Sequence, residues 1–362
     1  MKKKQALVFG YWRNNFGDDL MLSAFKELKS DTELIIAVDR KFSRYYKHLD
    51  VHVFSYGYLF RIINKVLIKL GFPGLFYLLF ANKARDFYVV GGSLFMENDA
   101  WKQQYRSMSY SVKHCDKSFV VSSNFGPYQS NDFLDAYKQF FRVFDRVVIR
   151  DKSSLGMFSE LGNVVYKPDI VLTLDDRVDV EKTNSVTVAA INLDNRKELV
   201  HFREAYERRL RDMISEFSIA GRKVCLFSFC EYEGDEMAAQ RIYQALPQDV
   251  SKNVVLYVHK FNEESLQTIK KSSLIIASRF HALVLAMKYR IPFYIISYSD
   301  KIDNVIHDFG YEKYSSRIQE FVKTELSFSD LLVVEDSRDF FDFTMLKDQY
   351  KEILNENSVD ER

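Results

Sequence analysis

Residues 274–287, LIIASRFHALVLAM, hold the most informative pattern in the sequence. Leu274–Ala277 is apolar at every position, which is typical of a parallel strand covered on both faces. A polar turn at Ser278 and Arg279 follows, and a helical pattern then runs on from His281. The stretch therefore predicts one strand–turn–helix unit of an α/β fold.

The same unit recurs on both sides of a charged stretch, DDRVDVEKTNS, that begins at Asp175. The strands predicted before this stretch are Ala6–Gly10, Leu34–Val38, Asp86–Val90, Ser118–Ser122 and Arg146–Ile149. The strands predicted after it are Val186–Asn192, Lys223–Phe229, Val254–Val258, Leu274–Ala277 and Phe293–Ile296. Repeated units on both sides of a polar linker predict two doubly wound, Rossmann-like α/β domains.

The linker suggests the domain boundaries. We expect one domain over residues 1–178, a second over 179–330, and a helical segment over 331–362 that crosses back to the first domain. The helix of that segment is predicted over Phe340–Leu354. In doubly wound folds ligands bind outside the carboxyl ends of the strands, so we expect the functional site in a cleft between the two domains.

Composition narrows the class of protein. The chain has 362 residues and is 47% hydrophobic, with 51 Lys and Arg residues against 50 Asp and Glu residues. Because nucleic-acid-binding proteins normally carry an excess of basic residues, this balance argues against nucleic acid as a partner. Any anionic ligand must be met by a local arrangement of charges.

Cysteine usage and hydropathy indicate the compartment. The three cysteines, Cys115, Cys225 and Cys230, have no CxxC spacing, so we expect neither a disulfide framework nor a zinc site, and a reducing compartment fits. The N-terminus has too few apolar residues for a signal peptide. Since no stretch reaches about 18 uncharged apolar residues, we expect a cytoplasmic protein without a transmembrane helix.

The strongest polar cluster contains Arg279 and His281. Both residues fall at a predicted helix N-terminus, where unpaired N–H groups and the helix dipole favour an anion. A guanidinium adds bidentate recognition of phosphate or carboxylate, and an imidazole exchanges protons near neutral pH. The alternative is a core histidine beside an arginine in a surface ion pair.

A second cluster, Asn14–Asp19, follows the first predicted strand and includes Asn15. Gly17 allows the backbone to approach a ligand closely, and Asp18 or Asp19 could accept a proton from a hydroxyl group. The alternative is that Asp18 only caps the helix that follows, because aspartate is a preferred N-cap residue.

Two glycine-containing turns also follow strands. Gly91, Gly92 and Ser93 suit a backbone cradle for an acidic or sugar ligand, but they suit a tight turn equally well. Asn124–Pro127 has the same two interpretations.

Two further cations are candidates for ligand contacts. Arg150 could bind a ligand, or it could pair with Asp151 while both cap the next helix. Lys301 could supply a further charge to a phosphate group, although a solvated surface lysine is the usual explanation of a single lysine.

Taken in order, these motifs resemble the polysaccharide pyruvyl transferase family from about Leu7 to about Gly310. The resemblance rests on Asn15-Phe16-Gly17-Asp18-Asp19, Gly91-Gly92-Ser93-Leu94, Gly126-Pro127, Arg150-Asp151 with Ser154, Pro168-Asp169, Arg279-Phe280-His281-Ala282, and Pro292 followed by Lys301. It implies a GT-B-like architecture with two Rossmann-like domains that face a cleft. It also implies transfer of pyruvate from phosphoenolpyruvate to two hydroxyls of a sugar, which makes a cyclic ketal.

The resemblance also assigns roles to residues. It places phosphoenolpyruvate on the second domain, at Arg279, Phe280 and His281, and the sugar acceptor on the first domain. Phe280 stands where the family has leucine. The family's second arginine has no clean equivalent; Arg196, a few residues displaced, is the nearest candidate.

The expected chemistry agrees with these residue types. His281 is the expected acid that protonates the enol carbon, Arg279 and Lys301 would hold the anion, and Asp18 or Asp19 would orient or deprotonate the acceptor hydroxyls. Phosphoenolpyruvate is a co-substrate, so we expect no cofactor. The seven histidines are scattered without ligand spacing, so we expect no metal.

The segment Tyr58–Phe80 suggests where the acceptor is found. Its first part, Tyr58–Leu70, predicts an amphipathic helix with Arg61, Lys65 and Lys69 in one stripe beside an apolar face. This pattern is typical of helices that lie on a membrane, here the inner face, where an undecaprenyl-diphosphate-linked sugar would be reached. The alternative is an ordinary helix packed on the first sheet with cations at its edge.

Two other function classes stay open at this stage. A GT-B glycosyltransferase that uses a nucleotide sugar would share the architecture and the need to bind phosphate, and it would release UDP or GDP where a pyruvyl transferase releases phosphate. A non-catalytic binding protein could keep the same fold.

Overall fold

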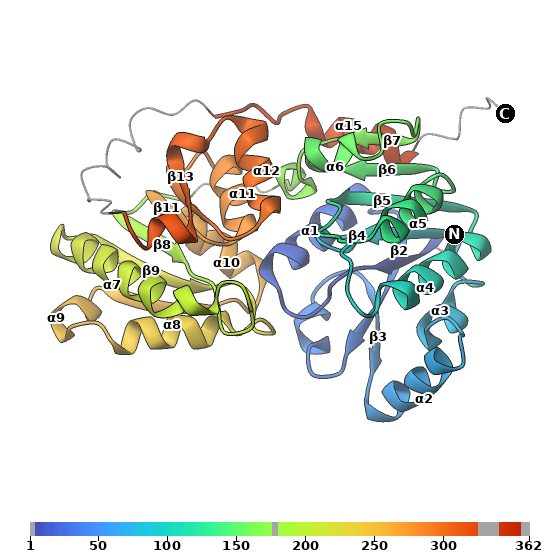
Figure 1. The fold of residues 1–362 in the computed structure, drawn as a ribbon, viewed down its shortest axis with the longest axis horizontal. Helices are drawn as coiled ribbons and strands as arrows, with labels where there is room; N and C mark the ends of the chain where they lie inside the picture. The colour runs from blue at the N-terminus through green and yellow to red at the C-terminus, as the bar shows by residue number, and fades with distance from the viewer. Residues whose placement is uncertain (1–3, 176–179, 325–339, 356–362) are drawn as a thin grey trace. The chain divides into compact units, whose positions relative to one another are not determined.

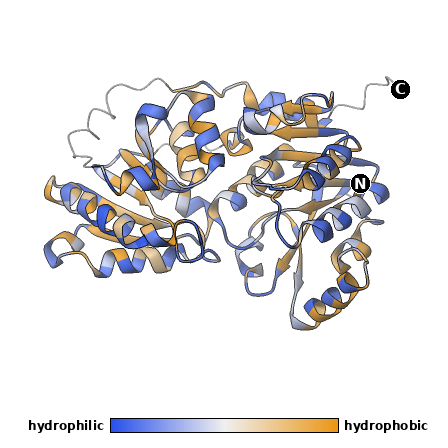
Figure 2. Ribbon diagram, viewed as in Figure 1, coloured by the Kyte–Doolittle hydropathy of each residue, from blue (hydrophilic) through white to orange (hydrophobic). Residues whose placement is uncertain are grey.

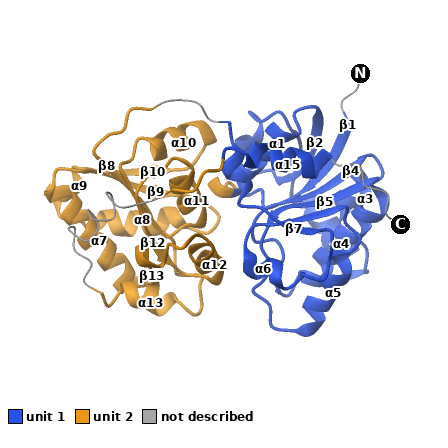
Figure 3. Ribbon diagram, turned by 90° about the horizontal axis from the view of Figure 1, so that it is seen from above, with its two compact units in different colours: residues 1–13, 18–175, 344–362 blue, residues 14–17, 176–343 orange. Residues whose placement is uncertain are grey.

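The computed structural model of the chain describes residues 4–175, 180–324 and 340–355 (Figure 1). The chain divides into two compact units, shown in different colours in Figure 3. Unit 1 comprises residues 1–13, 18–175 and 344–362, and unit 2 comprises residues 14–17 and 176–343. The short segment 14–17 therefore belongs to unit 2, although the residues on both sides of it belong to unit 1.

Unit 1 is built on a seven-stranded parallel sheet with the strand order β3-β2-β1-β4-β5-β6-β7. Its strands are β1 (Lys4–Phe9), β2 (Thr32–Asp39), β3 (His52–Tyr56), β4 (Asp86–Val90), β5 (Lys117–Ser123), β6 (Arg146–Ile149) and β7 (Val164–Tyr166). Its helices are α1 (Phe16–Leu28), η1 (Ser43–Tyr46), α2 (Tyr58–Lys69), α3 (Leu75–Phe80), α4 (Trp101–His114), α5 (Asn131–Phe141), α6 (Lys152–Gly156), η2 (Ile170–Thr173) and α15 (Leu346–Asn355). The first two residues of α1 belong to unit 2.

Aromatic side chains form much of the core of unit 1. Helices α1 and α15 cover one face of the sheet, as Figure 3 shows, and the ring of Phe25 on α1 lies 4.8 Å from the ring of Tyr88 on β4. On the face covered by α4 and α5, Phe95, Tyr137 and Phe141 pack edge to face. Because both faces are covered, strands β4 and β5 are buried at every position but the first. Figure 2 shows hydrophobic colouring in the sheet region.

Unit 2 is built on a six-stranded parallel sheet with the strand order β10-β9-β8-β11-β12-β13. Its strands are β8 (Ser185–Ala189), β9 (Lys223–Ser228), β10 (Val254–Val258), β11 (Leu274–Ala277), β12 (Phe293–Ser297) and β13 (Ser315–Arg317). Its helices are η3 (Val200–Phe202), α7 (Arg203–Ile219), α8 (Asp235–Gln244), α9 (Gln248–Ser251), α10 (Asn262–Lys270), α11 (Phe280–Lys288), α12 (Asp300–Phe309), η4 (Glu312–Tyr314) and α13 (Ile318–Phe321).

Both sheets have the doubly wound order, in which the chain first winds outward and then restarts beside the first strand. The direction of winding reverses between β1 and β4 in unit 1 and between β8 and β11 in unit 2. Loops diverge at such a point and leave room for a ligand at the carboxyl ends of the strands. The predicted fold class, two doubly wound α/β sheets, is confirmed.

Some predicted elements differ from the structure. Strands β3, β7 and β13 are not among the predicted strands. β3 is half-exposed with polar residues at both ends of a short apolar pair, β7 is apolar but only three residues long, and β13 has no apolar residue. The helix predicted over Phe340–Leu354 is α15, which begins only at Leu346 and belongs to unit 1. Part of the segment 331–362 lies outside the described residues.

Helix α15 is held on unit 1 by specific contacts. Tyr350 is fully buried, and its hydroxyl donates a 2.8 Å hydrogen bond to the carbonyl of Pro168. The Lys29 ammonium donates to the carbonyl of Leu354 at 2.7 Å, which satisfies an otherwise unpaired group at the end of the helix.

Among the described residues, no helix combines the length and apolar character needed to cross a membrane.

Candidate active site

A buried cluster of charged side chains lies at the carboxyl ends of the strands of unit 2. Arg279, which directly precedes α11, makes a two-point contact with Asp235: its Nε donates to Oδ2 at 2.7 Å and its Nη2 to Oδ1. Its Nη1 donates to Oε2 of Glu233 at 2.7 Å. Arg279 is only 7% exposed, so the guanidinium is buried between two carboxylates.

Backbone N–H groups donate further hydrogen bonds to the carboxylate of this buried ion pair. Asp235 is fully buried, and it also accepts hydrogen bonds from the backbone N–H groups of Cys230 at 3.0 Å and Asn192 at 3.2 Å. A buried ion pair is tolerated only when further hydrogen bonds compensate for the lost hydration of both charges. Asp235 therefore fixes the guanidinium of Arg279 in one orientation.

Two further cations approach the same cluster. Arg196 donates from Nη2 to Oε2 of Glu233 at 2.8 Å, and its guanidinium lies 4.3 Å from the ring centre of Tyr298. Lys301, in the first turn of α12, places its ammonium 5.9 Å from the same ring. Arg196, Arg279 and Lys301 thus gather around two carboxylates and one phenol, which leaves an excess of positive charge.

The pKa values of the neighbouring groups reflect this excess. Burial alone would raise the pKa of Glu233, but the guanidiniums of Arg279 and Arg196 lower it to about 2. Burial would likewise raise the pKa of Tyr298, but Lys301, Arg196 and Arg279 outweigh it and lower that pKa below its usual value. Both shifts indicate a positive potential that would stabilise an anion.

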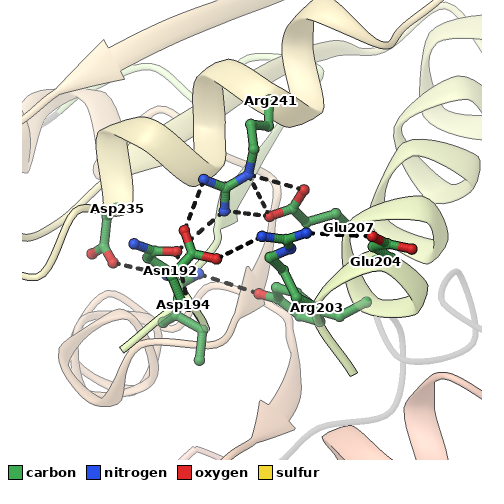
Figure 4. Close-up of polar contacts among 9 residues, drawn as sticks. Asn192, Asp194, Arg203, Glu204, Glu207, Asp235 and Arg241 are labelled. Carbon is green, nitrogen blue, oxygen red and sulfur yellow. Dashed lines mark hydrogen bonds and ion pairs between the residues drawn. The ribbon is translucent and has the colours of Figure 1, made fainter. Parts of the chain in front are cut away.

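A second layer of ion pairs holds the loop that leads to Arg196, as Figure 4 shows. Asp194 accepts from Arg203 at 2.9 Å and from Arg241 at 3.1 Å. Arg241 also donates to the side-chain oxygen of Asn192 at 3.1 Å and to Glu207. The loop after β8 is therefore cross-linked to α7 and α8, which limits how far it can move.

His281 packs directly on Gly17. A Cβ atom at Gly17 would overlap with Nδ1 of His281, so only glycine leaves room for the imidazole. The ring of Phe280, buried at 4% exposure, meets the imidazole edge to face at 5.2 Å. Gly17, a candidate for ligand contact in the sequence, makes room for the side chain of His281 in the structure, and its role in ligand binding stays a prediction.

The segment Asn14–Gly17 is tied into unit 2 by several contacts. The N–H of Phe16 donates to the carbonyl of Phe229 at 2.9 Å, and Asn15 forms an isolated β-bridge with Cys230. The amide of Asn14 donates to Glu231 at 3.2 Å and to the carbonyl of His259 at 3.3 Å. The two strongest sequence motifs, far apart in the chain, therefore meet in one unit.

The two candidate carboxylates lie just after this segment, in the first turn of α1. The helix begins at Phe16, and the side-chain oxygen of Asn15 accepts from the N–H of Gly17 at 3.2 Å. The alternative that Asp18 is the N-cap residue is therefore wrong. Asp19 accepts a 2.6 Å hydrogen bond from the hydroxyl of Tyr46.

In unit 1, Arg150 has internal partners. It is 3% exposed and donates to Asp169 at 2.7 Å and to the side-chain oxygen of Asn124 at 2.9 Å. A Cβ atom at Gly92 would overlap with this guanidinium, so the glycine leaves space for the arginine. Asp151 instead caps α6 by accepting from the N–H of Ser154.

The rest of the glycine turn makes contacts within unit 1. The carbonyl of Gly91 accepts from the hydroxyl of Ser123, and the hydroxyl of Ser93 donates to Asn124 at 3.3 Å. The roles in ligand binding that the sequence suggests for Arg150, Gly91, Gly92 and Ser93 stay predictions.

Glu233, Asp235 and Tyr298 are members of the cluster that were not predicted from the sequence. Glu233 lies in the loop after β9 and Asp235 begins α8, so both follow a strand as Arg279 does, but this position does not show which guanidinium they meet. Tyr298 directly follows β12. Within residues 4–175, 180–324 and 340–355, no group of three or more His, Cys, Asp or Glu side chains is placed to hold a metal ion.

The contact between Gly17 and His281 can be tested by substitution. We expect Gly17→Ala to lower the free energy of unfolding by about 1–3 kcal/mol, because the new methyl group displaces either the imidazole or the segment 14–17. Urea denaturation measures the change. Gly162→Ala is the matched control, because a Cβ atom there meets nothing within 4 Å. Equal stability of the two variants would show that the imidazole does not pack on Gly17.

The low pKa of Glu233 predicts a pH-dependent contribution to stability. Because the carboxyl has an ordinary pKa of 4.5 and a folded-state pKa of about 2, its ionised form stabilises the fold above pH 4.5, and this stabilisation is lost as the pH falls toward 2. Glu233→Gln should therefore cost about 2 kcal/mol at neutral pH and progressively less between pH 4.5 and 3. Denaturation at several pH values measures this, with the exposed Glu264→Gln as control. A difference from wild type that is independent of pH contradicts the assignment.

Comparison with solved structures shows the fold. MnaA from S. aureus, solved with UDP, has a TM-score of 0.59 and 12% identity, with 100% of this chain and 99% of that chain covered. UDP-GlcNAc 2-epimerase from Neisseria meningitidis, bound to UDP-GlcNAc, has a TM-score of 0.59 and 8% identity, with 98% and 100% covered. HepE from Anabaena, in complex with UDP and glucose, has a TM-score of 0.53 and 10% identity, with 98% and 99% covered. At such low identity these likenesses establish a GT-B-like fold and no more.

No curated protein sequence shows significant similarity to this chain. The family model of polysaccharide pyruvyl transferase matches residues 15–300, which include Asn15, Gly17, Arg196, Arg279, His281 and the carboxylates that pair with the two arginines. This chain belongs to the polysaccharide pyruvyl transferase family.

Proposed function

We propose that this protein transfers the pyruvyl group of phosphoenolpyruvate to two hydroxyls of a sugar in a surface-polysaccharide precursor and so forms a cyclic ketal. Membership of the family gives the reaction class. The excess of cations around Tyr298 is the observation that carries the choice of donor, because phosphoenolpyruvate brings a phosphate and a carboxylate that both need positive partners.

The cations are assigned different tasks. Arg279 uses all three of its nitrogens on Asp235 and Glu233, so its proposed task is to fix the cluster and to supply positive potential. Arg196 contributes only Nη2 to Glu233, and its Nε is buried without a hydrogen-bond partner among the described residues. Arg196 and Lys301 are therefore assigned the direct contacts to the phosphate and the carboxylate.

The proposed reaction balances without a redox step. His281 donates a proton to the terminal enol carbon, which becomes the methyl group, and positive charge develops on the neighbouring carbon. One sugar hydroxyl attacks that carbon and loses its proton, and the carbon–oxygen bond to phosphate breaks. The second hydroxyl then closes the ring and loses its proton. One of the two released protons restores His281, and the other leaves with hydrogen phosphate.

Asp18 and Asp19 are assigned to the acceptor. Asp18 follows Gly17 directly in the chain, and Gly17 contacts His281, so these carboxylates are the acidic groups nearest in sequence to that contact. A carboxylate beside a sugar hydroxyl orients it and accepts its proton. The acceptor sugar is proposed to be lipid-linked, as an undecaprenyl-diphosphate precursor would be.

Binding of the donor can be measured without the acceptor. We expect the protein to bind phosphoenolpyruvate in a calorimetric titration, and Lys301→Ala to weaken binding by about 10- to 100-fold through loss of a charge-assisted contact. Lys313→Ala is the matched control, since Lys313 also lies over a tyrosine ring, that of Tyr314, but away from the cluster. If UDP-GlcNAc binds and phosphoenolpyruvate does not, a nucleotide-sugar glycosyltransferase is the better assignment.

Turnover tests the role of the imidazole. With a lipid extract that contains polyprenyl-diphosphate-linked saccharides, we expect phosphate release from phosphoenolpyruvate and an acceptor mass increased by one pyruvate minus one water. His281→Ala should lower kcat by about 10²–10⁴-fold and leave the affinity for phosphoenolpyruvate within a few-fold. His307→Ala, an exposed histidine on α12, is the control. Unchanged turnover in His281→Ala would remove this residue as the acid.

A further inference from the structure

The exposed apolar side chains of unit 1 gather on α2 and α3. Helix α2 contains no buried residue, although most of its side chains are apolar. The large apolar side chains that are exposed in this region are Tyr58, Leu59, Ile62, Ile63, Val66, Leu70, Phe72 and Leu79. Such a gathering of apolar surface on a water-soluble domain marks an interaction site.

Helix α2 has three distinct faces. The inner face packs on unit 1 through Phe60, whose ring lies 5.2 Å from that of Phe54. The outer face carries Leu59, Ile62, Ile63, Val66 and Leu70, which follow the i, i+3, i+4, i+7, i+11 spacing of one helix stripe. Figure 2 shows hydrophobic and hydrophilic residues mixed along this helix. The outer stripe is apolar without being needed for the core.

The third face carries Arg61, Lys65 and Lys69, which lie one helical turn apart beside the outer apolar stripe. Residues 57–85 contain these three cations, Lys83 and Arg85, but no Asp or Glu. The whole chain is balanced, with 51 basic and 50 acidic residues. The local excess of positive charge is therefore specific to the segment that exposes the apolar stripe.

The apolar stripe is presented in a fixed orientation. The side-chain oxygen of Asn64 accepts from the N–H of Leu75 at 2.7 Å, which joins α2 to the start of α3. The N–H of Gly74 donates to the hydroxyl of Ser107 on α4 at 3.0 Å, and Phe76 of α3 is buried against the sheet. The turn between α2 and α3 thus anchors the outer helix to unit 1.

We propose that α2 and the turn that follows it dock in the interface of an anionic lipid bilayer. The outer stripe would enter the boundary between head groups and acyl chains. Lys65 and Lys69 would reach the negatively charged head groups, together with Arg61, which also pairs with Asp39 at 3.5 Å. A second copy of the chain fits this surface less well, because it would bring two sets of cations together without an acidic partner in the segment. The inference goes beyond the pyruvyl transfer proposed above and agrees with a lipid-linked acceptor.

Vesicle binding tests this inference with the full chain and without phosphoenolpyruvate. We expect co-sedimentation with vesicles of phosphatidylglycerol and phosphatidylcholine, weak binding to phosphatidylcholine alone, and weaker binding at high salt. Lys65→Glu combined with Lys69→Glu should lower the partition coefficient at least tenfold, since each cation near the surface accounts for roughly fivefold. The matched control is Lys252→Glu, an exposed lysine of unit 2.

The apolar contribution is tested separately. Val66→Ser with Ile62→Ser should also lower the partition coefficient severalfold, whereas Ile219→Ser, at an exposed apolar residue of unit 2, should not. Circular dichroism checks that each variant is folded. If the apolar variants do not fold, the lysine variants still test the proposal.

Vesicle binding that none of the α2 variants changes would overturn the proposal. So would a concentration-dependent dimer that Val66→Ser abolishes, because α2 would then be a self-association surface. Since phosphoenolpyruvate is absent, failure here leaves the proposed transfer reaction untouched.

Discussion

The buried contact of Arg279 with Asp235 and Glu233 is the constraint on which the site of unit 2 depends. It joins the loop after β9 to the N-terminus of α11, and Glu233 extends the link to Arg196 in the loop after β8. Three loops are thereby fixed at the point where the winding of the sheet reverses. An arginine in this position acts less as a free anion receptor than as the centre of a rigid, positively biased cluster.

The same principle operates in unit 1. Arg150 and Asp169 form a buried pair at the carboxyl ends of β6 and the loop before η2, and Asn124 supplies a further hydrogen bond. Glycine has a corresponding role in both units, because Gly92 makes room for Arg150 and Gly17 makes room for His281. Glycines that a sequence suggests as ligand contacts can therefore be required by a side chain of the protein itself.

The sequence predicted the architecture well because the central strands are continuous apolar runs followed by polar turns. Short edge strands such as β13 lack that signal, since one residue of Ser315–Arg317 is charged and none is apolar. Of the site, Arg279, His281 and Lys301 were identified by type and by position after a strand. Glu233 and Asp235 were missed because acidic residues at the start of a helix are common, and nothing in the sequence states which guanidinium they meet. The sequence could not show that the apolar stripe of α2 is exposed, because apolar residues have the same helical spacing whether they face the core or the solvent.

The assignment of residues 14–17 to unit 2 has a consequence for how the protein can be divided. The linker near residue 180 looks like the natural place to cut the chain, yet a fragment that begins there would lack Phe16, whose ring stacks on Phe227 at 5.6 Å and whose amide meets the carbonyl of Phe229. That fragment would leave an aromatic surface and a backbone acceptor exposed to water. The second unit is therefore completed by four residues, 14–17, that stand in the chain before the main part of the first unit, and a cut near residue 180 would separate them from their contacts with Phe227 and Phe229.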